Sequence, residues 1–339
     1  MLSFTSKAIT KDLLANLPER SRKVLIHRFG LGTSNERRTL DAIGKEYGIT
    51  RERIRQIENH GLGAIRDSGA YTNHTESLEE LQQVIRELGG ILPEHVILKE
   101  IPKNESERNH LVFLLTVGRP FVYKRETDHF HPRWHVDGTL ADTIERALIR
   151  LHDDIDPEHL IPQSEFLALF VRYIKEEGAR APEENVLLRW LGISKKVGVN
   201  PLGEWGRVES PHVRIRNTRD FAYLTLKRHG SPMHFVEVAQ GIEKLFGREA
   251  HPATTHNELI KDGRFVLVGR GLYALKEWGY APGIVREVIK NILESEGPLS
   301  RQDIIERVKR ERYVKDATVL VNLQSGAFAR TPDGRYTIV

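Results

Sequence analysis

The chain has 339 residues, with 51 lysine and arginine residues against 47 aspartate and glutamate residues, a formal net charge of +4 and no cysteine. The lack of cysteine excludes structural disulfides, thiolate metal sites and cysteine nucleophiles. No segment approaches the roughly 18 consecutive apolar residues of a membrane span, and the N-terminus lacks the long apolar core of a signal peptide. We therefore expect a cytoplasmic protein of two or more domains that does not contact membranes.

The charge is divided unevenly along the sequence. Residues 1–67 hold 13 Lys and Arg against 8 Asp and Glu, a net charge of +5, whereas residues 68–216 hold 19 against 24, a net charge of −5. Residues 217–281 and 282–339 each carry +2. Affinity for a phosphate backbone is therefore expected mainly near the N-terminus, and the acidic middle is better suited to protein contact or to spacing.

The segment Thr39–Ile65 predicts two short helices that meet at a tight turn. Gly44 allows the two helices to approach closely, and Gly48 supplies a positive φ angle at the turn without steric cost. Thr50 is suited to cap the second helix with its hydroxyl group. Apolar residues recur at the spacing that forms the buried face of a helix pair, namely Leu40, Ile43, Tyr47, Ile49, Ile54 and Ile57.

This pattern leaves one face of the second helix free to point outward. With Ile54 and Ile57 buried, the outward residues are Arg51, Glu52, Arg53, Arg55 and Gln56. Arginine and glutamine form paired hydrogen bonds with guanine and adenine edges in the major groove, and helix-turn-helix proteins place such residues at the start of the recognition helix. Gly61 and Gly63 have low helix propensity, so we expect this helix to end early.

The segment Leu17–Ile65 closely resembles region 4 of sigma-70 family factors, the domain that reads the promoter −35 element. Leu17–Gly32 (LPERSRKVLIHRFGLG) is similar to the first half of that region, and Thr50–Glu58 (TRERIRQIE) is similar to its recognition helix. The sequence departs from the family at Ala42, where an acidic residue is usual, and in the connection Leu31–Arg38, whose length varies in the family.

The resemblance implies DNA-binding roles by position. The implied base-reading residues are Arg51, Glu52 and Gln56. The residues implied to support readout or to contact the DNA backbone are Arg53, Arg55, Arg20 and Arg28. Backbone contacts fix the register of a protein on DNA but carry no sequence information. The alternative is a trihelical domain used only for protein contact. It does not account for the outward arginines, because folding does not require them.

The resemblance also implies partners. Region 4 of the family binds promoter DNA and docks on the flap of the polymerase β subunit, so double-stranded −35-like DNA and RNA polymerase are the expected partners. We recognise no sigma region 2, the region that carries the aromatic segment that melts the −10 element. We therefore expect the protein not to initiate transcription alone, but to regulate transcription or to assist polymerase.

Residues 68–77 are polar and rich in turn formers, which predicts a linker. The remainder of the chain repeats one unit, and the last two copies share a G-x-F and G-x-Y pattern at Gly263–Tyr273 and Gly326–Tyr336. Each pattern predicts a β-hairpin with a glycine-containing turn. Apolar stripes at Ile284–Leu293 and Ile304–Val308 predict helices before the last hairpin. Two or three helices followed by a hairpin form a winged-helix arrangement.

The segment Asn217–Gly279 also resembles the HARE-type helix-turn-helix domain, a family that includes the delta subunit of some bacterial RNA polymerases. The resemblance rests on a helix at Phe235–Ile242, a third helix near Thr254–Lys261 and a terminal G-x-Y-x-L-x-x-W pattern. It implies no DNA contacts, because that family often uses the domain for protein contact.

We therefore predict a mainly α fold with small β-hairpins, in which an N-terminal trihelical helix-turn-helix domain precedes about four tandem winged-helix-like modules. The first two modules are expected to contain helices at Leu78–Leu88 and Pro93–Ile101, then at 140–151, 162–177 and 184–191. Tryptophans close three modules as buried core residues, namely Trp134, Trp205 and Trp278. The predicted boundaries are 1–67 for the DNA-binding domain, 68–77 for the linker, and 78–137, 139–212, 217–279 and 282–339 for the modules.

His129, His131 and His135 lie close together in DHFHPRWH. They suggest a metal site, but no second cluster with ligand spacing accompanies them, and turn or hairpin histidines are the simpler interpretation. The sequence contains no phosphate-binding loop, dinucleotide turn or nucleophile elbow. We therefore expect no metal, no cofactor, no catalytic residues and no enzyme activity.

These features together predict a sequence-specific DNA-binding transcription factor that acts at promoters with RNA polymerase. One alternative is an accessory protein that binds polymerase or a sigma factor without recognising promoters itself. Another is the targeting module of a DNA modification or restriction system whose catalytic chain is separate.

Overall fold

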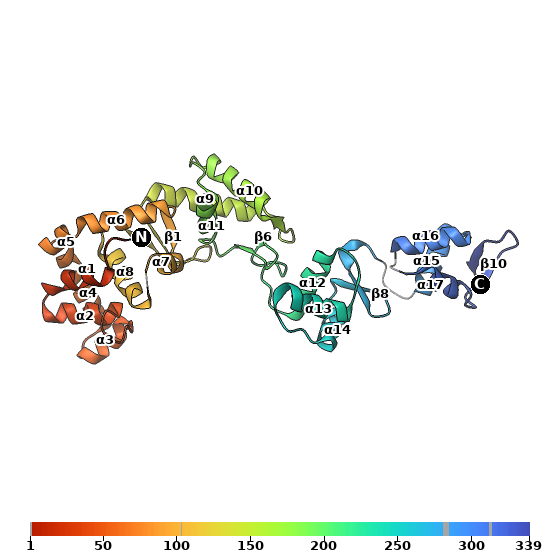
Figure 1. The fold of residues 1–339 in the computed structure, drawn as a ribbon, viewed down its shortest axis with the longest axis horizontal. Coiled ribbons are helices and arrows are strands. Elements are labelled where there is room, and N and C mark those ends of the chain that lie inside the picture. Colours follow the sequence, from red (N-terminus) through yellow and green to blue (C-terminus); the bar gives the residue numbers. More distant parts are fainter. Residues whose placement is uncertain (1, 103, 281–284, 312–313) are drawn as a thin grey trace. The chain divides into compact units, whose positions relative to one another are not determined.

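A computed structural model describes residues 2–102, 104–280, 285–311 and 314–339 (Figure 1). The chain divides into two compact units. The first contains residues 1–198 and 205–208, and the second contains residues 199–204 and 209–339. The structure is mainly helical with small antiparallel sheets, which confirms the mainly α class that the sequence predicts.

The first unit begins with four helices that pack around apolar side chains. α2 ends at Gly30 in the left-handed conformation, with φ of 64°, and this geometry stops the helix. Leu25 is fully buried on α2, and Phe29 is nearly so. The four helices are α1 (Ser6–Ala15), α2 (Glu19–Phe29), α3 (Leu40–Tyr47) and α4 (Arg51–Arg66).

The chain continues without a break in the packing. The three strands of the segment that follows α4 form an antiparallel sheet of order β1-β3-β2. In this sheet Trp134 pairs with Leu92 on one side and Tyr123 on the other. Trp134 is buried, as predicted. The elements are α5 (Gly69–Asn73), α6 (Thr75–Glu87), β1 (Ile91–Pro93), α7 (Glu94–Glu100), α8 (Glu105–Val117), β2 (Val122–Lys124) and β3 (Arg133–His135).

The structure differs from the linker predicted at residues 68–77. This segment forms α5, and Tyr71 is buried in the core. The phenol oxygen of Tyr71 accepts a hydrogen bond of 2.9 Å from the backbone N–H of Arg119. Tertiary packing of one aromatic residue therefore outweighs the turn-forming composition around it.

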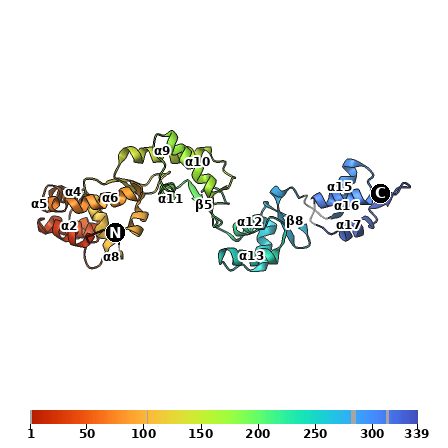
Figure 2. The ribbon, with the colours of Figure 1, turned by 45° about the horizontal axis from the view of Figure 1, so that its top comes forward.

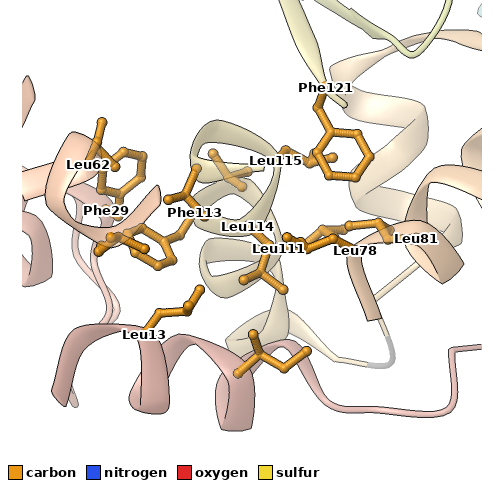
Figure 3. Close-up of a cluster of buried hydrophobic side chains, with 14 of the residues drawn as sticks. Leu13, Phe29, Leu62, Leu78, Leu81, Leu111, Phe113, Leu114, Leu115 and Phe121 are labelled. Atoms are coloured by element: carbon orange, nitrogen blue, oxygen red, sulfur yellow. The ribbon is translucent and has the colours of Figure 1, made fainter. Parts of the chain in front are cut away.

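The helix α8, which the sequence did not predict, lies at the centre of this core. Figure 3 shows Phe113 pointing toward Phe29 and Leu62, while Leu115 lies beside Phe121 on the other side. The rings of Phe29 and Phe113 meet edge to face, with centroids 5.4 Å apart. α1, α2 and α4 therefore share one core with the segment that follows residue 67.

The rest of the first unit forms a second core. α10 carries Phe166, which is fully buried and stacks on Trp205 at 5.0 Å. The strands form a sheet of order β4-β6-β5. The predicted helices at 140–151, 162–177 and 184–191 are confirmed as the helices of this segment. The elements are α9 (Gly138–Asp154), β4 (Ile161–Pro162), α10 (Gln163–Glu176), α11 (Glu184–Leu191), β5 (Val197–Val199) and β6 (Glu204–Arg207).

The second unit contains two further groups of three helices with a hairpin (Figure 2). The predicted hairpins are confirmed, with Gly271 and Gly334 in the left-handed region at their turns. Ile284, the first residue of a predicted stripe, lies outside the described residues, as does the start of the predicted module 282–339. Trp278 packs partly buried against β8 and β9.

The elements of the second unit form two groups along the chain. The first group forms a sheet of order β7-β9-β8 and consists of α12 (Thr218–His229), β7 (Met233–His234), α13 (Phe235–Phe246), α14 (Pro252–Lys261), β8 (Phe265–Gly269), β9 (Leu272–Leu275) and the 3-10 helix η1 (Lys276–Trp278). The second group consists of α15 (Val285–Glu296), α16 (Arg301–Glu311), α17 (Asp316–Leu323), β10 (Phe328–Arg330) and β11 (Tyr336–Ile338).

Candidate nucleic-acid interface

The helices α3 and α4 meet at the turn that the sequence predicts. Gly48 ends α3 with φ of 66°. The hydroxyl group of Thr39 accepts a hydrogen bond of 3.1 Å from the Ala42 N–H, and that of Thr50 accepts one of 3.2 Å from the Arg53 N–H. Both helix starts are therefore capped by side chains, which fixes where each helix begins.

Gly44 sets the distance between the two helices. A Cβ atom at this position would lie 2.7 Å from the backbone oxygen of Ile49, which is closer than a side-chain carbon can approach. Beneath the turn, Val24 of α2 packs with Ile43 and Ile54, and all three are fully buried. The predicted apolar face is thus confirmed, and Val24 of α2 packs against it.

The opposite face of α4 is exposed to solvent, as predicted. The exposed side chains are those of Arg51, Glu52, Arg53, Arg55 and Gln56. They lie along the first turns of the helix, where helix-turn-helix proteins place base-reading residues. The structure thus brings the three candidate base-reading residues to one surface, together with the two candidate supporting arginines.

Two side-chain pairs order this surface. Arg55 donates two hydrogen bonds to the Glu52 carboxylate, of 2.9 and 2.7 Å. This contact with Arg55 lowers the pKa of Glu52, so the carboxylate is ionised. Arg53 donates a hydrogen bond of 2.9 Å to the side-chain oxygen of Gln56. Exposed pairs of this kind contribute little stability, so DNA can replace them at small cost.

The two candidate backbone contacts on α2 differ in their surroundings. Arg20 is exposed and makes no ion pair with any described residue. Arg28 is half-buried and contacts Glu58 of α4 at 3.3 Å. Burial raises the pKa of Glu58, and Arg28 opposes that rise. Arg28 therefore holds α2 against α4, whereas Arg20 is available to a ligand.

The expected early end of the recognition helix is wrong, because α4 continues to Arg66. Gly61 faces α2, where a Cβ atom would lie 3.2 Å from Leu25 Cδ1. The glycine therefore permits close packing of two helices, and this packing outweighs its low helix propensity. At the helix end, Arg66 donates hydrogen bonds of 3.0 and 2.7 Å to the carbonyl oxygens of Val117 and Thr116 on α8.

The three candidate histidines do not form one cluster. His129 is exposed, His131 packs edge to face against His95 at 5.8 Å, and His135 is buried on β3. In the part of the chain that the structure describes, no three His, Asp or Glu side chains are grouped closely enough to hold a metal ion.

Sequence reasoning missed one residue that acts on this surface. Asn109 of α8 donates hydrogen bonds to the carbonyl oxygens of Gly30, at 3.0 Å, and Asn35, at 2.7 Å. It also accepts one of 2.7 Å from Arg37 Nε. Asn109 therefore fixes the connection between α2 and α3. No local signal marks it, because Asn109 follows a polar run at the start of α8.

None of the described helices is both long enough and apolar enough to cross a membrane.

Residues 13–67 match the family described as Sigma-70, region 4, so α2, α3 and α4 belong to a domain of this type. The chain is 49% identical over 51 residues to the RNA polymerase principal sigma factor HrdD of Streptomyces viridifaciens. It is 55% identical over 53 residues to the RNA polymerase sigma factor RpoS of Coxiella burnetii. The matched stretches cover 15% and 16% of this chain and 15% of each relative. No solved structure matches the chain significantly.

Proposed function

We propose that the protein is a DNA-binding transcription factor that reads a −35-like promoter element through α4 and acts together with RNA polymerase. The observation that carries this proposal is the exposed α4 surface of Arg51, Glu52 and Gln56 within a sigma-70 region 4 domain. Arginine and glutamine have the hydrogen-bonding geometry to distinguish base pairs in the major groove. In this proposal Arg53 and Arg55 support readout, and the protein has no enzymatic role.

The proposal extends to polymerase because the similar proteins are sigma factors. Docking of the domain on the polymerase β flap, in the cytoplasm, is part of the same hypothesis. The protein would then assist or regulate initiation by a separate sigma factor. Footprinting of a promoter with polymerase, with and without the protein, tests this role directly.

We further propose that the second unit consists of winged-helix modules, the first of them of HARE type, and that they contact protein. In each group the third helix exposes an apolar residue, Ile260 (61% exposed) on α14 and Val321 (67%) on α17. α4 instead exposes arginines along its first turns. If polymerase captures the protein but no footprint forms on any promoter, the accessory-protein hypothesis replaces promoter recognition.

Replacing Gln56 with alanine tests the base-reading role. The variant is expected to bind its preferred duplex more weakly by about 1–3 kcal/mol and to lose discrimination at one base pair. Affinity for random duplex should change little, because the amide contacts a base and not a phosphate. Competition binding with the preferred and random duplexes measures both values. Equal losses on the two ligands would remove Gln56 from the base-reading set.

Arg20 and Arg28 give a paired prediction about the DNA backbone. Arg20→Ala is expected to weaken binding evenly across sequences and to lower the slope of log K against log salt by about 0.9, which corresponds to one phosphate. Arg28→Ala should also weaken binding evenly, and it should destabilise the domain because Glu58 loses its partner. Salt titrations together with thermal unfolding separate the two effects. An unchanged slope for Arg20→Ala would exclude its backbone contact.

A further inference from the structure

The connection between α2 and α3 forms a hollow with α7 and α8. This hollow, of about 600 Å³, is lined by Ser34, Asn35, Arg37, Leu98, Arg108 and Asn109. Two guanidinium groups, a hydroxyl group and two amides therefore surround one space. Half of these residues come from outside residues 13–67, the segment that matches the sigma-70 region 4 family.

The geometry of the hollow is fixed by Asn109. Its amide nitrogen donates hydrogen bonds to Gly30 O and Asn35 O, and its oxygen accepts the bond from Arg37 Nε. Asn35 is held in the left-handed region with φ of 51°, which is uncommon for a residue other than glycine. Gly30 cannot carry a side chain, because a Cβ atom would lie 2.7 Å from Asn109 Nδ2.

This arrangement presents the terminal nitrogens of Arg37 to a ligand. Its Nε is used by Asn109, while among the described residues its two Nη groups make no hydrogen bond or ion pair. The neighbouring arginines on the same connection and on α2 are paired, Arg38 with Glu46 and Arg28 with Glu58. Arg37 is held instead by a neutral amide, and the planar Nη pair matches the geometry of phosphate oxygens.

The position of the hollow in the chain points to the phosphates of DNA. Arg37 lies two residues before Thr39, the N-cap of α3. In helix-turn-helix proteins the first helix crosses the DNA backbone, and helix N-termini favour phosphate groups. A backbone that passes the start of α3 would therefore continue toward Arg37 and Arg108.

We infer that Arg37, positioned by Asn109, and Arg108 of α8 form a DNA-phosphate site that extends the interface of α3 and α4 onto α8. The inference rests on the proposed function. It means that the segment after the sigma region 4 domain takes part in DNA binding, even though residues 68–216 are acidic overall.

The test uses the full chain and the salt dependence of duplex binding. Arg37→Ala and Arg108→Ala are each expected to lower the slope of log K against log salt by about 0.9, and to weaken binding roughly eightfold at 0.1 M salt on preferred and random duplexes alike. Arg37→Lys and Arg108→Lys keep the charge and should keep most of the slope. Arg86→Ala, an exposed arginine of α6 outside the hollow, is the matched control and should change nothing.

The outcomes separate this inference from the proposed function. If a variant that combines Arg37→Ala with Arg108→Ala keeps the wild-type salt slope while Gln56→Ala still loses discrimination, the phosphate site is wrong and base reading stands. If the wild-type protein binds no duplex, the proposed function fails first. A titration with inorganic phosphate in the absence of DNA tests whether the site binds a free phosphate ion instead of DNA. Saturable binding there, with an unchanged DNA slope, would identify a small-anion site and overturn the DNA contact.

Discussion

Replacing Phe113 with alanine is expected to destabilise the DNA-binding domain by about 3–5 kcal/mol, although this residue lies outside the segment that matches sigma region 4. Phe113 is fully buried on α8 and packs edge to face on Phe29. Alanine would remove this aromatic contact and leave a cavity between α8 and α2. Urea unfolding of the full chain, followed by duplex binding in the same samples, measures the loss.

The matched control is Phe170→Ala. Phe170 is also fully buried, but it belongs to the separate core formed by α9, α10 and α11. Its removal should destabilise that core by a similar amount and leave duplex binding unchanged in the absence of urea. If residues 1–67 alone unfold cooperatively at the same urea concentration as in the full chain, α8 is not required by the domain, and the prediction is wrong.

Replacing Gly44 with valine is expected to abolish specific DNA binding. The new side chain would meet the Ile49 carbonyl, where even a Cβ atom would be only 2.7 Å away, so α3 and α4 must separate. Overpacking of this kind costs about 1–3 kcal/mol in stability. Because α4 would turn relative to α3, the contacts of Gln56 and its neighbours would be lost together. Competition binding and thermal unfolding report the two effects separately.

Gly63→Ala is the control for this variant. Gly63 lies within α4, and no atom lies within 4 Å of the position that its Cβ would take. Alanine there should stabilise the helix by about 0.5–1 kcal/mol through its higher helix propensity, with duplex binding retained. If Gly44→Val binds its preferred duplex as tightly as the wild type, the close approach of α3 and α4 does not determine the position of the recognition helix.

The helix-turn-helix could be predicted because its signals are local. Gly48, Thr50 and the apolar spacing around Ile54 each act within a few residues, and the structure has each of them as expected. The close packing of Gly61 against α2 could not be predicted from such local signals. Its effect depends on Leu25, which lies 36 positions earlier in the sequence and meets it only in the folded core.

α8 was missed for a related reason. Leu111, Val112, Phe113, Leu114 and Leu115 form a continuous apolar run, so the segment has no polar face and no helical period to detect. A helical stretch that is apolar on all sides is buried on all sides. Here α1, α2 and α4 pack against one side of the apolar half of α8, while α6 and β2 cover the other. Asn109 shares that helix, and its role depends on the connection it contacts.

The central position of α8 also has a consequence for synthesis of the chain on the ribosome. Residues 1–67 emerge first, yet the apolar side chains of Leu13, Phe29 and Leu62 have no helix to cover them until α8 has been made. Translation proceeds at about 5–20 residues per second, so the 50 residues from 67 to 117, the end of α8, take roughly 2.5–10 s. During this interval the nascent domain exposes its core to solvent and to chaperones. A competent DNA-reading surface therefore forms late, although its residues are among the first to be translated.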